Sequence, residues 1–369
     1  MKSIVEEKKL VSPYLLFFLM HSTQTGVGVL KFQSHIIEGA GRDSWISVFA
    51  FGLMLHIIFF MIVFILKQSD SGDILSFHKE VFGKIIGGLL NLVLACYFSF
   101  ASLFTLHSYI DILQLWVFDG IHSWEFSLLF SIIIYYIVLG GFRIITAIAY
   151  WGVVIPSLLL LSLVYLLNYS EVSYILPLFN SELKDYVISA RATAPTFLGF
   201  EAVLVFFPFI REREYSSKWG HLAIFYTTIL YTTITIITLM FFSLGKLEHL
   251  TWPTLTMIKI IQFPFLERFE FIFIFTWLLV VMPVICIYLW SAIRSVKMTF
   301  PKVKQSFVLI GLLIVFHFVN SELIEMHFSY IMAQIIGTSG LVLLLCYIPL
   351  LFLIALVKKK MKNRATDLT

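Results

Sequence analysis

The chain has 369 residues, of which 60% are hydrophobic and 13% are charged, whereas a soluble domain has roughly 45 to 50% apolar and about 25% charged residues. This excess excludes an ordinary soluble core and indicates an all-α integral membrane protein whose helices face lipid. The net charge of +4 does not indicate a nucleic-acid partner, because the Lys and Arg residues lie in short clusters between apolar runs.

The residue pattern does not indicate an enzyme or a metal centre. The three cysteines, Cys96, Cys286 and Cys346, lie in apolar segments without a C-x-x-C pair or a histidine at metal-ligand spacing. The sequence also lacks a recognisable pair of nucleophile and base and a nucleotide-binding loop. We therefore expect no catalytic residues, no metal and no cofactor.

Ten predominantly apolar segments follow one another along the chain, and each is predicted to form a transmembrane helix. The predicted bounds are 12–36, 44–66, 84–115, 124–141, 143–167, 191–210, 219–244, 269–293, 305–320 and 331–357. We expect the first segment to be a retained span, because it is too long for a signal peptide and lacks a small-residue cleavage site. Residues 1–369 are expected to form one transmembrane domain.

The distribution of positive charge predicts the topology. Nineteen of the 26 Lys and Arg residues lie in the two ends of the chain and in alternate connections, and six lie in the remaining connections. Positive charge accumulates on the cytoplasmic side of a membrane, so we expect an even number of helices with both termini in the cytoplasm. Lys31 lies inside the first segment and is expected to snorkel to the outer interface.

Two external connections, residues 168–190 and 245–268, are long enough to carry structure of their own. In the second, the apolar residues Leu255, Ile258, Ile261 and Phe265 have helical spacing. This spacing fits a helix on the membrane surface with Trp252 as an interfacial anchor. It fits equally well a segment packed into the outer face of the protein.

Two segments contain residues that interrupt helices. The first contains Gly26 and Gly28, and the sixth contains Pro195, Gly199 and Glu201. A glycine lowers helix propensity by about 1 kcal/mol, and a charged side chain near the midplane costs at least about 2.5 kcal/mol. We expect Glu201 to face the interior, where it has a functional or helix-orienting role or is simply a buried neutral carboxyl.

Ten helices divide into two sets of five that run in opposite directions, and the interrupted helices lead each set. This arrangement is typical of secondary transporters, in which helix breaks free backbone groups to bind a ligand near the midplane. We therefore predict a 5+5 inverted repeat, with the first repeat over about 12–167 and the second over about 191–357.

Other polar residues in the third segment are weaker signals. His107 and Asp111 are four residues apart near its outer end, where we expect a solvated pair. Tyr97 lies in the middle of the segment, where it either lines a central cavity or packs against its neighbours.

The glycine motifs carry a resemblance to known proteins. Gly26-Val27-Gly28 and Gly199-Phe200-Glu201 resemble the motifs of the first and sixth helices in the amino acid-polyamine-organocation transporter superfamily. Four further stretches resemble the B subunit of spore germinant receptors, the GerAB-type spore germination permeases, and this resemblance spans the chain. They are Phe17 to Gln24, Phe207-Pro208-Phe209, Trp252-Pro253-Thr254-Leu255, and Phe265-Leu266-Glu267-Arg268-Phe269-Glu270.

The resemblance implies a location, partners and a binding site. It implies a subunit of the spore inner membrane that binds a small nutrient germinant, with an amino acid as the expected class, and assembles with a larger membrane A subunit and a lipoprotein C subunit. It also implies a ligand cavity between the first, third, sixth and eighth helices. The residues expected there are Thr25, Gly26, Val27, Gly28, Tyr97, Ala101, Thr196, Phe197, Gly199, Phe200, Glu201, Val284 and Tyr288.

Three functions remain open on the sequence alone, because a fold does not decide function. The first is a receptor subunit in which a nutrient shifts a conformational equilibrium by binding the two states unequally. The second is a secondary transporter for an amino acid or similar solute that works by alternating access. The third is a conduit for water or ions within a receptor complex.

Overall fold

The computed structural model describes residues 5–262, 267–322 and 326–367. Regular structure in this part of the chain is helical, apart from one isolated parallel bridge between Val11 and Ile210. Within the described residues, seven helices are long and apolar enough to cross a membrane, or eight if a bent pair between Leu183 and Phe209 counts as one span. The chain is therefore an all-helical integral membrane protein, as its composition predicts.

The first five predicted segments each contain helix. A 3-10 turn, η1 (Glu7–Lys9), precedes them. They correspond to α1 (Leu15–Gln24) with η2 (Val27–Leu30) and α2 (Gln33–Ile36), α3 (Ser44–Lys67) after the turn η3 (Gly41–Asp43), α4 (Ile74–Trp116), α5 (Ser123–Leu139), and α6 (Phe142–Leu160) with η4 (Leu161–Tyr169). Two of the ten predicted spans fall below the length of a spanning helix, since α1 has 10 residues and α5 has 17.

The second half follows the same pattern, although the sixth segment starts at Leu183 and not near 191. After η5 (Val172–Ile175) come α7 (Leu183–Thr193), η6 (Ala194–Phe197), η7 (Phe200–Ala202), α8 (Val203–Phe206), η8 (Phe207–Phe209), α9 (Arg213–Phe241), α10 (Leu244–Leu247), α11 (Pro253–Ile258), α12 (Phe269–Thr299), α13 (Gln305–Glu322), α14 (Met326–Val342), the π-helical turn η9 (Leu343–Tyr347) and α15 (Ile348–Asp367).

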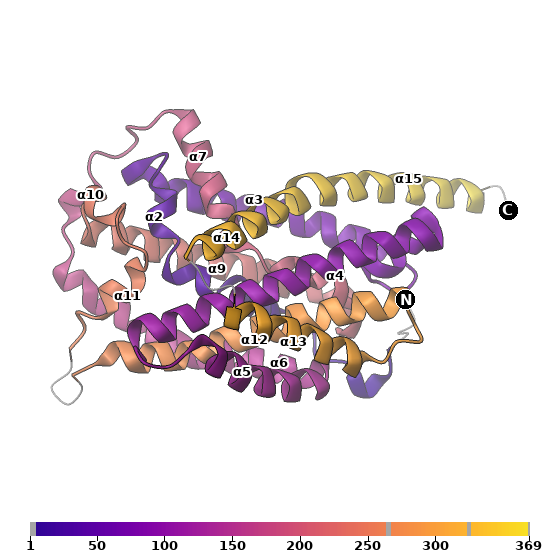
Figure 1. The fold of residues 1–369 in the computed structure, drawn as a ribbon. Helices are drawn as coiled ribbons and strands as arrows, with labels where there is room; N and C mark the ends of the chain where they lie inside the picture. The colour runs from indigo at the N-terminus through magenta and orange to yellow at the C-terminus, as the bar shows by residue number, and fades with distance from the viewer. Residues whose placement is uncertain (1–4, 263–266, 323–325, 368–369) are drawn as a thin grey trace.

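Both termini lie at the same end of the bundle, which we call the terminal end (Figure 1). The basic connections that were predicted to share one side of the membrane meet there. Arg294 pairs with Asp73 at 2.8 Å, and Lys358 pairs with Glu80 at 2.5 Å. Arg143 donates to the carbonyl of Lys8 at 3.0 Å. The charge count therefore groups these connections correctly.

The connection between α9 and α12 packs into the protein at the opposite end. The side chains of Leu255, Ile258 and Ile261 are fully buried, and Trp252 is 7% exposed. Of the two interpretations of this segment, the buried one is confirmed and the membrane-surface helix is wrong. Phe265, the fourth residue of the spacing, lies outside the described residues.

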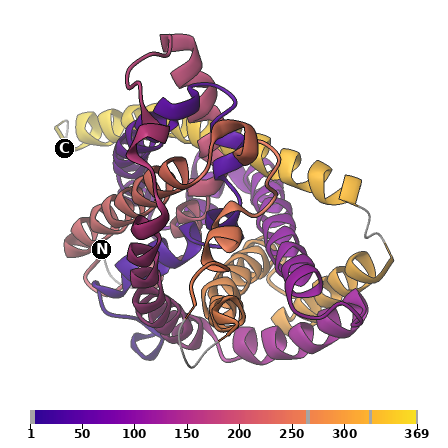
Figure 2. The ribbon, with the colours of Figure 1, turned by 90° about the vertical axis from the view of Figure 1, so that its left-hand side faces the viewer.

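The centre of the bundle is formed by α4 and α12, which pack along each other (Figure 2). The broken segments pack against this pair, because α1 and η7 contact α12 and α8 contacts both helices. This arrangement places the two helix breaks next to the third and eighth predicted spans.

Candidate functional site at the two helix breaks

The first break lies directly after α1. The Thr25 hydroxyl and the Thr25 backbone N–H both donate to the carbonyl of His21, at 2.9 Å and 3.1 Å, in the last turn of the helix. Gly26 follows with ψ −140°, outside the helical region, and the chain resumes as η2. The break therefore falls at the glycine motif predicted from the sequence.

The second break lies between η6 and η7, where the helix axis bends by 52°. Leu198 is extended, and Gly199 has φ +129°, a conformation that favours glycine. A Cβ atom on Gly199 would lie 2.1 Å from the carbonyl oxygen of Thr23 in α1. Glycine is thus required here twice, for its backbone conformation and for the contact between the two broken segments.

The carbonyl groups freed by the breaks are bound by side chains of α1 and α9. The Tyr231 hydroxyl in α9 donates to the carbonyl of Gln24 at 2.5 Å and to that of Thr196 at 3.2 Å. The Gln24 amide donates to the carbonyl of Phe197 at 3.3 Å. A buried carbonyl without a donor costs about 1 to 3 kcal/mol, so these contacts stabilise both breaks in one arrangement.

Sequence reasoning missed Tyr231, although α9 carries a signal. Its run Tyr226-Thr227-Thr228-Ile229-Leu230-Tyr231-Thr232-Thr233 is unusually polar for a spanning helix. Thr227 and Thr228 both bond to the carbonyls four residues earlier, and the Thr227 hydroxyl also contacts His21 Nδ1 at 2.8 Å and Gln24 Oε1 at 3.2 Å in α1. Tyr231 is too long for such a local bond, and a buried tyrosine hydroxyl usually finds a partner on another segment.

Glu201 is fully buried and is bound by two donors. The backbone N–H of Gly199 donates to Oε2 at 2.6 Å, and the Tyr97 hydroxyl in α4 donates to Oε1 at 2.7 Å. The carboxyl group therefore bridges the second break and attaches it to α4. Of the interpretations of Glu201, these two hydrogen bonds favour a helix-orienting role.

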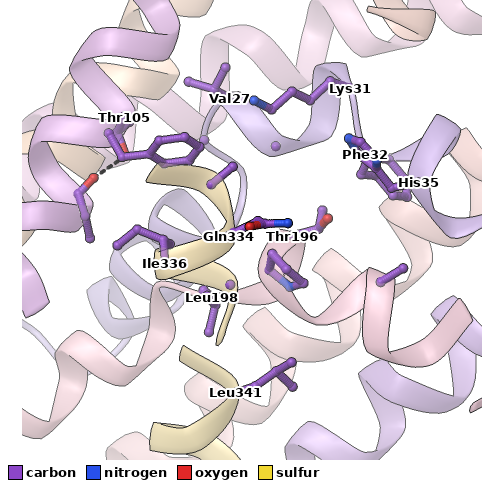
Figure 3. Close-up of a pocket in the computed structure, with 18 of the residues that line it drawn as sticks. Val27, Lys31, Phe32, His35, Thr105, Thr196, Leu198, Gln334, Ile336 and Leu341 are labelled. Carbon is purple, nitrogen blue, oxygen red and sulfur yellow. Dashed lines mark hydrogen bonds between the residues drawn. The ribbon is translucent and has the colours of Figure 1, made fainter. Parts of the chain in front are cut away.

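A cavity of about 580 Å³ lies beside the two breaks (Figure 3). This volume is in the range of small-molecule sites, about 300 to 1,000 Å³. Val27 and Lys31 lie on one side of it, and Leu198 and Leu341 lie on the other. Elements from both halves of the chain surround it, including η2, α4, η6, α12 and α14.

Seven of the thirteen predicted site residues line this cavity, and six do not. The lining residues are Gly26, Val27, Gly28, Ala101, Thr196, Val284 and Tyr288. The other six, which are not among the lining residues, are Thr25, Tyr97, Phe197, Gly199, Phe200 and Glu201. Gly199 and Glu201 instead form the contacts of the second break with α1 and α4 that are described above.

The wall contributed by α14 was missed. Seven of its residues line the cavity, namely Tyr330, Ala333, Gln334, Ile336, Gly337, Thr338 and Leu341. A Cβ on Gly337 would lie 3.0 Å from the Pro195 side chain, and one on Gly340 would lie 2.3 Å from the Leu198 side chain. These glycines allow α14 to approach the second break closely, which a small-residue pattern in the last predicted span could have indicated.

Of two expectations about polar residues, one is wrong. The side chain of Lys31 lines the cavity, and its extension toward the outer interface stays a prediction. His107 is 1% exposed and is not part of a solvated pair. Its ring contacts Asn320 at 3.1 Å and Ser329 at 2.5 Å, so α13 and α14 cover it. Helical spacing identifies a common face, but it does not show which helices pack on that face.

Comparison with known proteins identifies the family. Residues 10–329 match the family described as spore germination protein. The chain is 37% identical to spore germination protein GerQB of Bacillus cereus over 354 residues, which cover 96% of this chain and 98% of the relative. The chain belongs to the spore germination protein family. This confirms the resemblance to spore germination proteins.

More distant members of the spore germination protein family also match most of the chain. Spore germination protein B2 of Bacillus subtilis (strain 168) is 23% identical over 70% of this chain and 71% of its own length. Spore germination protein A2 of the same strain is 22% identical over 81% of this chain and 83% of its own length. These relatives are germination proteins and not enzymes, in agreement with the prediction.

Proposed function

We propose that this chain is the B subunit of a nutrient germinant receptor and that it binds a small nutrient, an amino acid, in the cavity beside the two breaks. One observation carries the proposal: a cavity of small-molecule size touches both helix interruptions. Its wall is largely apolar but includes the charged residues Lys31, Glu38 and Arg191. A few polar groups in an apolar pocket are typical of small-molecule recognition.

The proposed architecture is a 5+5 inverted repeat of ten spans with interrupted first and sixth helices. It is supported by helix in each of the ten predicted segments and by breaks in the first and the sixth. The basic terminal end would face the cytoplasm, because positive charge accumulates on that side. Membership in the spore germination protein family supports a location in the spore inner membrane.

The proposed mechanism is a shift between conformations that partner subunits detect. The lining residues come from segments that do not share one rigid helix, because η2, η6 and α14 each contribute to the wall. A nutrient that contacts all three binds more tightly when they are in one relative arrangement, and only such unequal binding can shift an equilibrium. The A and C subunits of the receptor would respond to this arrangement.

The test is dipicolinic acid release from spores that lack this gene, measured against a panel of amino acids, sugars and nucleosides. We expect loss of response to one nutrient class and recovery when the gene is restored. An unchanged response to every nutrient would contradict the receptor function, and solute uptake in proteoliposomes would then test the transporter function.

A cavity-filling variant tests the position of the site. Ala101 is 3% exposed in α4 and lines the cavity, so Ala101→Trp should abolish the response to the nutrient. Ala50→Trp is the matched control, because Ala50 is exposed on α3 and lies outside the cavity wall. If Ala101→Trp spores respond like the wild type, the nutrient binds elsewhere.

A further inference from the structure

Lys31 presents an unpaired ammonium group to the cavity. Its Nζ atom lies 5.2 Å from the centre of the Phe104 ring and 5.3 Å from that of Trp252. No carboxylate among the described residues forms an ion pair with it, and no oxygen there accepts a hydrogen bond from it. Figure 3 shows the side chain extending across one side of the cavity.

The two aromatic rings explain how the ammonium is held in position. A cation over an aromatic face is attracted by the ring quadrupole, and this attraction is stronger in a desolvated site. Neither ring accepts the three N–H donors as an oxygen atom would. The contacts therefore orient Lys31 and leave its donors available to a bound molecule.

The charges around the cavity favour a ligand with a carboxylate. Arg191 also lines the wall and forms no ion pair in the part of the chain that the structure describes. Glu38 carries the one carboxylate among the described lining residues, and its Oε1 atom lies 3.9 Å from Nδ1 of His35. Asp111 on α4 does not line the cavity. It accepts a hydrogen bond from Ser329 at 3.3 Å, lies 3.6 Å from the His107 ring, and acts on Lys31 electrostatically without forming an ion pair with it. Among the described lining residues, two cations thus face one carboxylate, and an anionic group on a ligand would balance the charge at the wall.

We propose that Lys31 binds the carboxylate of the nutrient, an inference that rests on the proposed function of the cavity. The ammonium would form a charge-assisted hydrogen bond, and such bonds are roughly twice as strong as neutral ones. The ligand class is an amino acid with a free carboxylate. A neutral amide of the same amino acid offers an uncharged acceptor and leaves the ammonium without a counter-charge.

The experiment uses the purified full chain in lipid nanodiscs and equilibrium binding of a panel of radiolabelled L-amino acids, sugars and nucleosides. For each amino acid that binds, the matching amide competes in the same assay. Lys31→Met keeps the length and apolar character of the side chain and removes the charge. We expect affinity for the acid to fall by about tenfold to a hundredfold, the loss typical of one charged hydrogen bond. Affinity for the amide should change little.

The ratio of acid to amide affinity separates recognition from folding. The wild type should prefer the acid, and Lys31→Met should lose that preference, whereas a general loss of folding would lower both affinities together. Lys31→Arg should retain a preference for the acid. The control is Lys246→Met, since Lys246 also lies over an aromatic ring, Phe242 at 5.3 Å, but is outside the cavity wall.

The outcomes distinguish this inference from the proposed function. If Lys31→Met keeps the wild-type preference for the acid, or if the wild type binds acid and amide equally, the role of Lys31 is wrong and the cavity remains a binding site. If the wild type binds nucleosides or sugars and no amino acid, the carboxylate assignment is also wrong. If it binds no compound of the panel, the proposed function and this inference fail together.

Discussion

Replacement of Gly199 by alanine tests whether the two broken segments are in direct contact. The glycine has φ +129°, and a Cβ atom there would lie 2.1 Å from the Thr23 carbonyl oxygen. The atom that it would meet belongs to the backbone, so no side-chain rotation can relieve the overlap. The second break must separate from α1 to accommodate the methyl group.

The expected cost has two parts. A residue other than glycine in a glycine-only backbone region costs about 1 to 3 kcal/mol, and overpacking adds typically about 1 to 3 kcal/mol. We therefore expect Gly199→Ala to lower the free energy of unfolding by about 2 to 6 kcal/mol. Gly141→Ala is the matched control, because Gly141 has φ +86° and no heavy atom lies within 4 Å of the position that a Cβ would take there. It should show the backbone cost alone.

The assay is thermal unfolding of both variants in lipid nanodiscs, followed by tryptophan fluorescence, together with nutrient binding. Gly199→Ala should unfold at a lower temperature than Gly141→Ala and should bind the nutrient less tightly. If the two variants lose equal amounts of unfolding free energy, the close approach of the second break to Thr23 is wrong. The two broken segments would then not be in contact beside the cavity.

Three further substitutions have defined expectations. Tyr231→Phe removes the hydroxyl that binds two carbonyls at the breaks, so the free energy of unfolding in nanodiscs should fall by about 1 to 3 kcal/mol. Tyr165→Phe is the control, because it removes one hydroxyl of an exposed pair and should leave that free energy unchanged. Glu201→Gln places an amide donor against one of the two donors that now bind the carboxylate. The germination response of spores should therefore weaken by about tenfold, or about 1.4 kcal/mol, with expression preserved. Wild-type germination in this variant would limit Glu201 to a packing role. Asp73→Asn removes the buried carboxylate that pairs with Arg294 at 2.8 Å. Thermal unfolding should show that the free energy of unfolding falls by about 3 to 5 kcal/mol. An unchanged free energy of unfolding would mean that the pair is solvated.

Much of the helical architecture was predictable, because it depends on local pattern. Continuous apolar runs place α3, α12 and α13 within a few residues of their predicted bounds, apart from the C-terminal end of α12. Gly83, with φ +78°, divides α4 at the predicted start of the third span. The start of α7 was missed by eight residues, since Leu183–Thr193 has an amphipathic and not an apolar sequence.

The breaks were predictable from glycine and proline, whereas the wall of the cavity was not. Glycine limits helix formation locally, so Gly26 and Gly199 mark the interruptions wherever the rest of the chain lies. The direction of a side chain depends on the neighbouring segment. Lys31 faces the cavity because Phe104 and Trp252 hold it there, and these residues are distant in the sequence.

The two broken segments are joined at the terminal end as well as at the breaks. The N–H of Val11 donates to the carbonyl of Phe209 at 2.9 Å, and the N–H of Arg211 donates to the carbonyl of Val11 at 2.8 Å. The guanidinium of Arg294 lies 4.7 Å from the centre of the Phe209 ring and pairs with Asp73. The halves of the first and sixth segments on this side are therefore tied to each other and to the connection that precedes α4.

This joining determines how a change at the cavity can reach the terminal end. The Gly199 contact with Thr23 and the Val11 bridge fix the two half-segments at both of their ends. If a nutrient displaces η2 and η6, the backbone can bend at the two breaks. The half-segments on the side of the terminal end, α1 and the stretch from η7 to η8, would then move together, and the connection before α4 that contains Asp73 would move with them. Packed elements of this kind shift between discrete arrangements and do not deform continuously, which is the behaviour that the proposed receptor function requires.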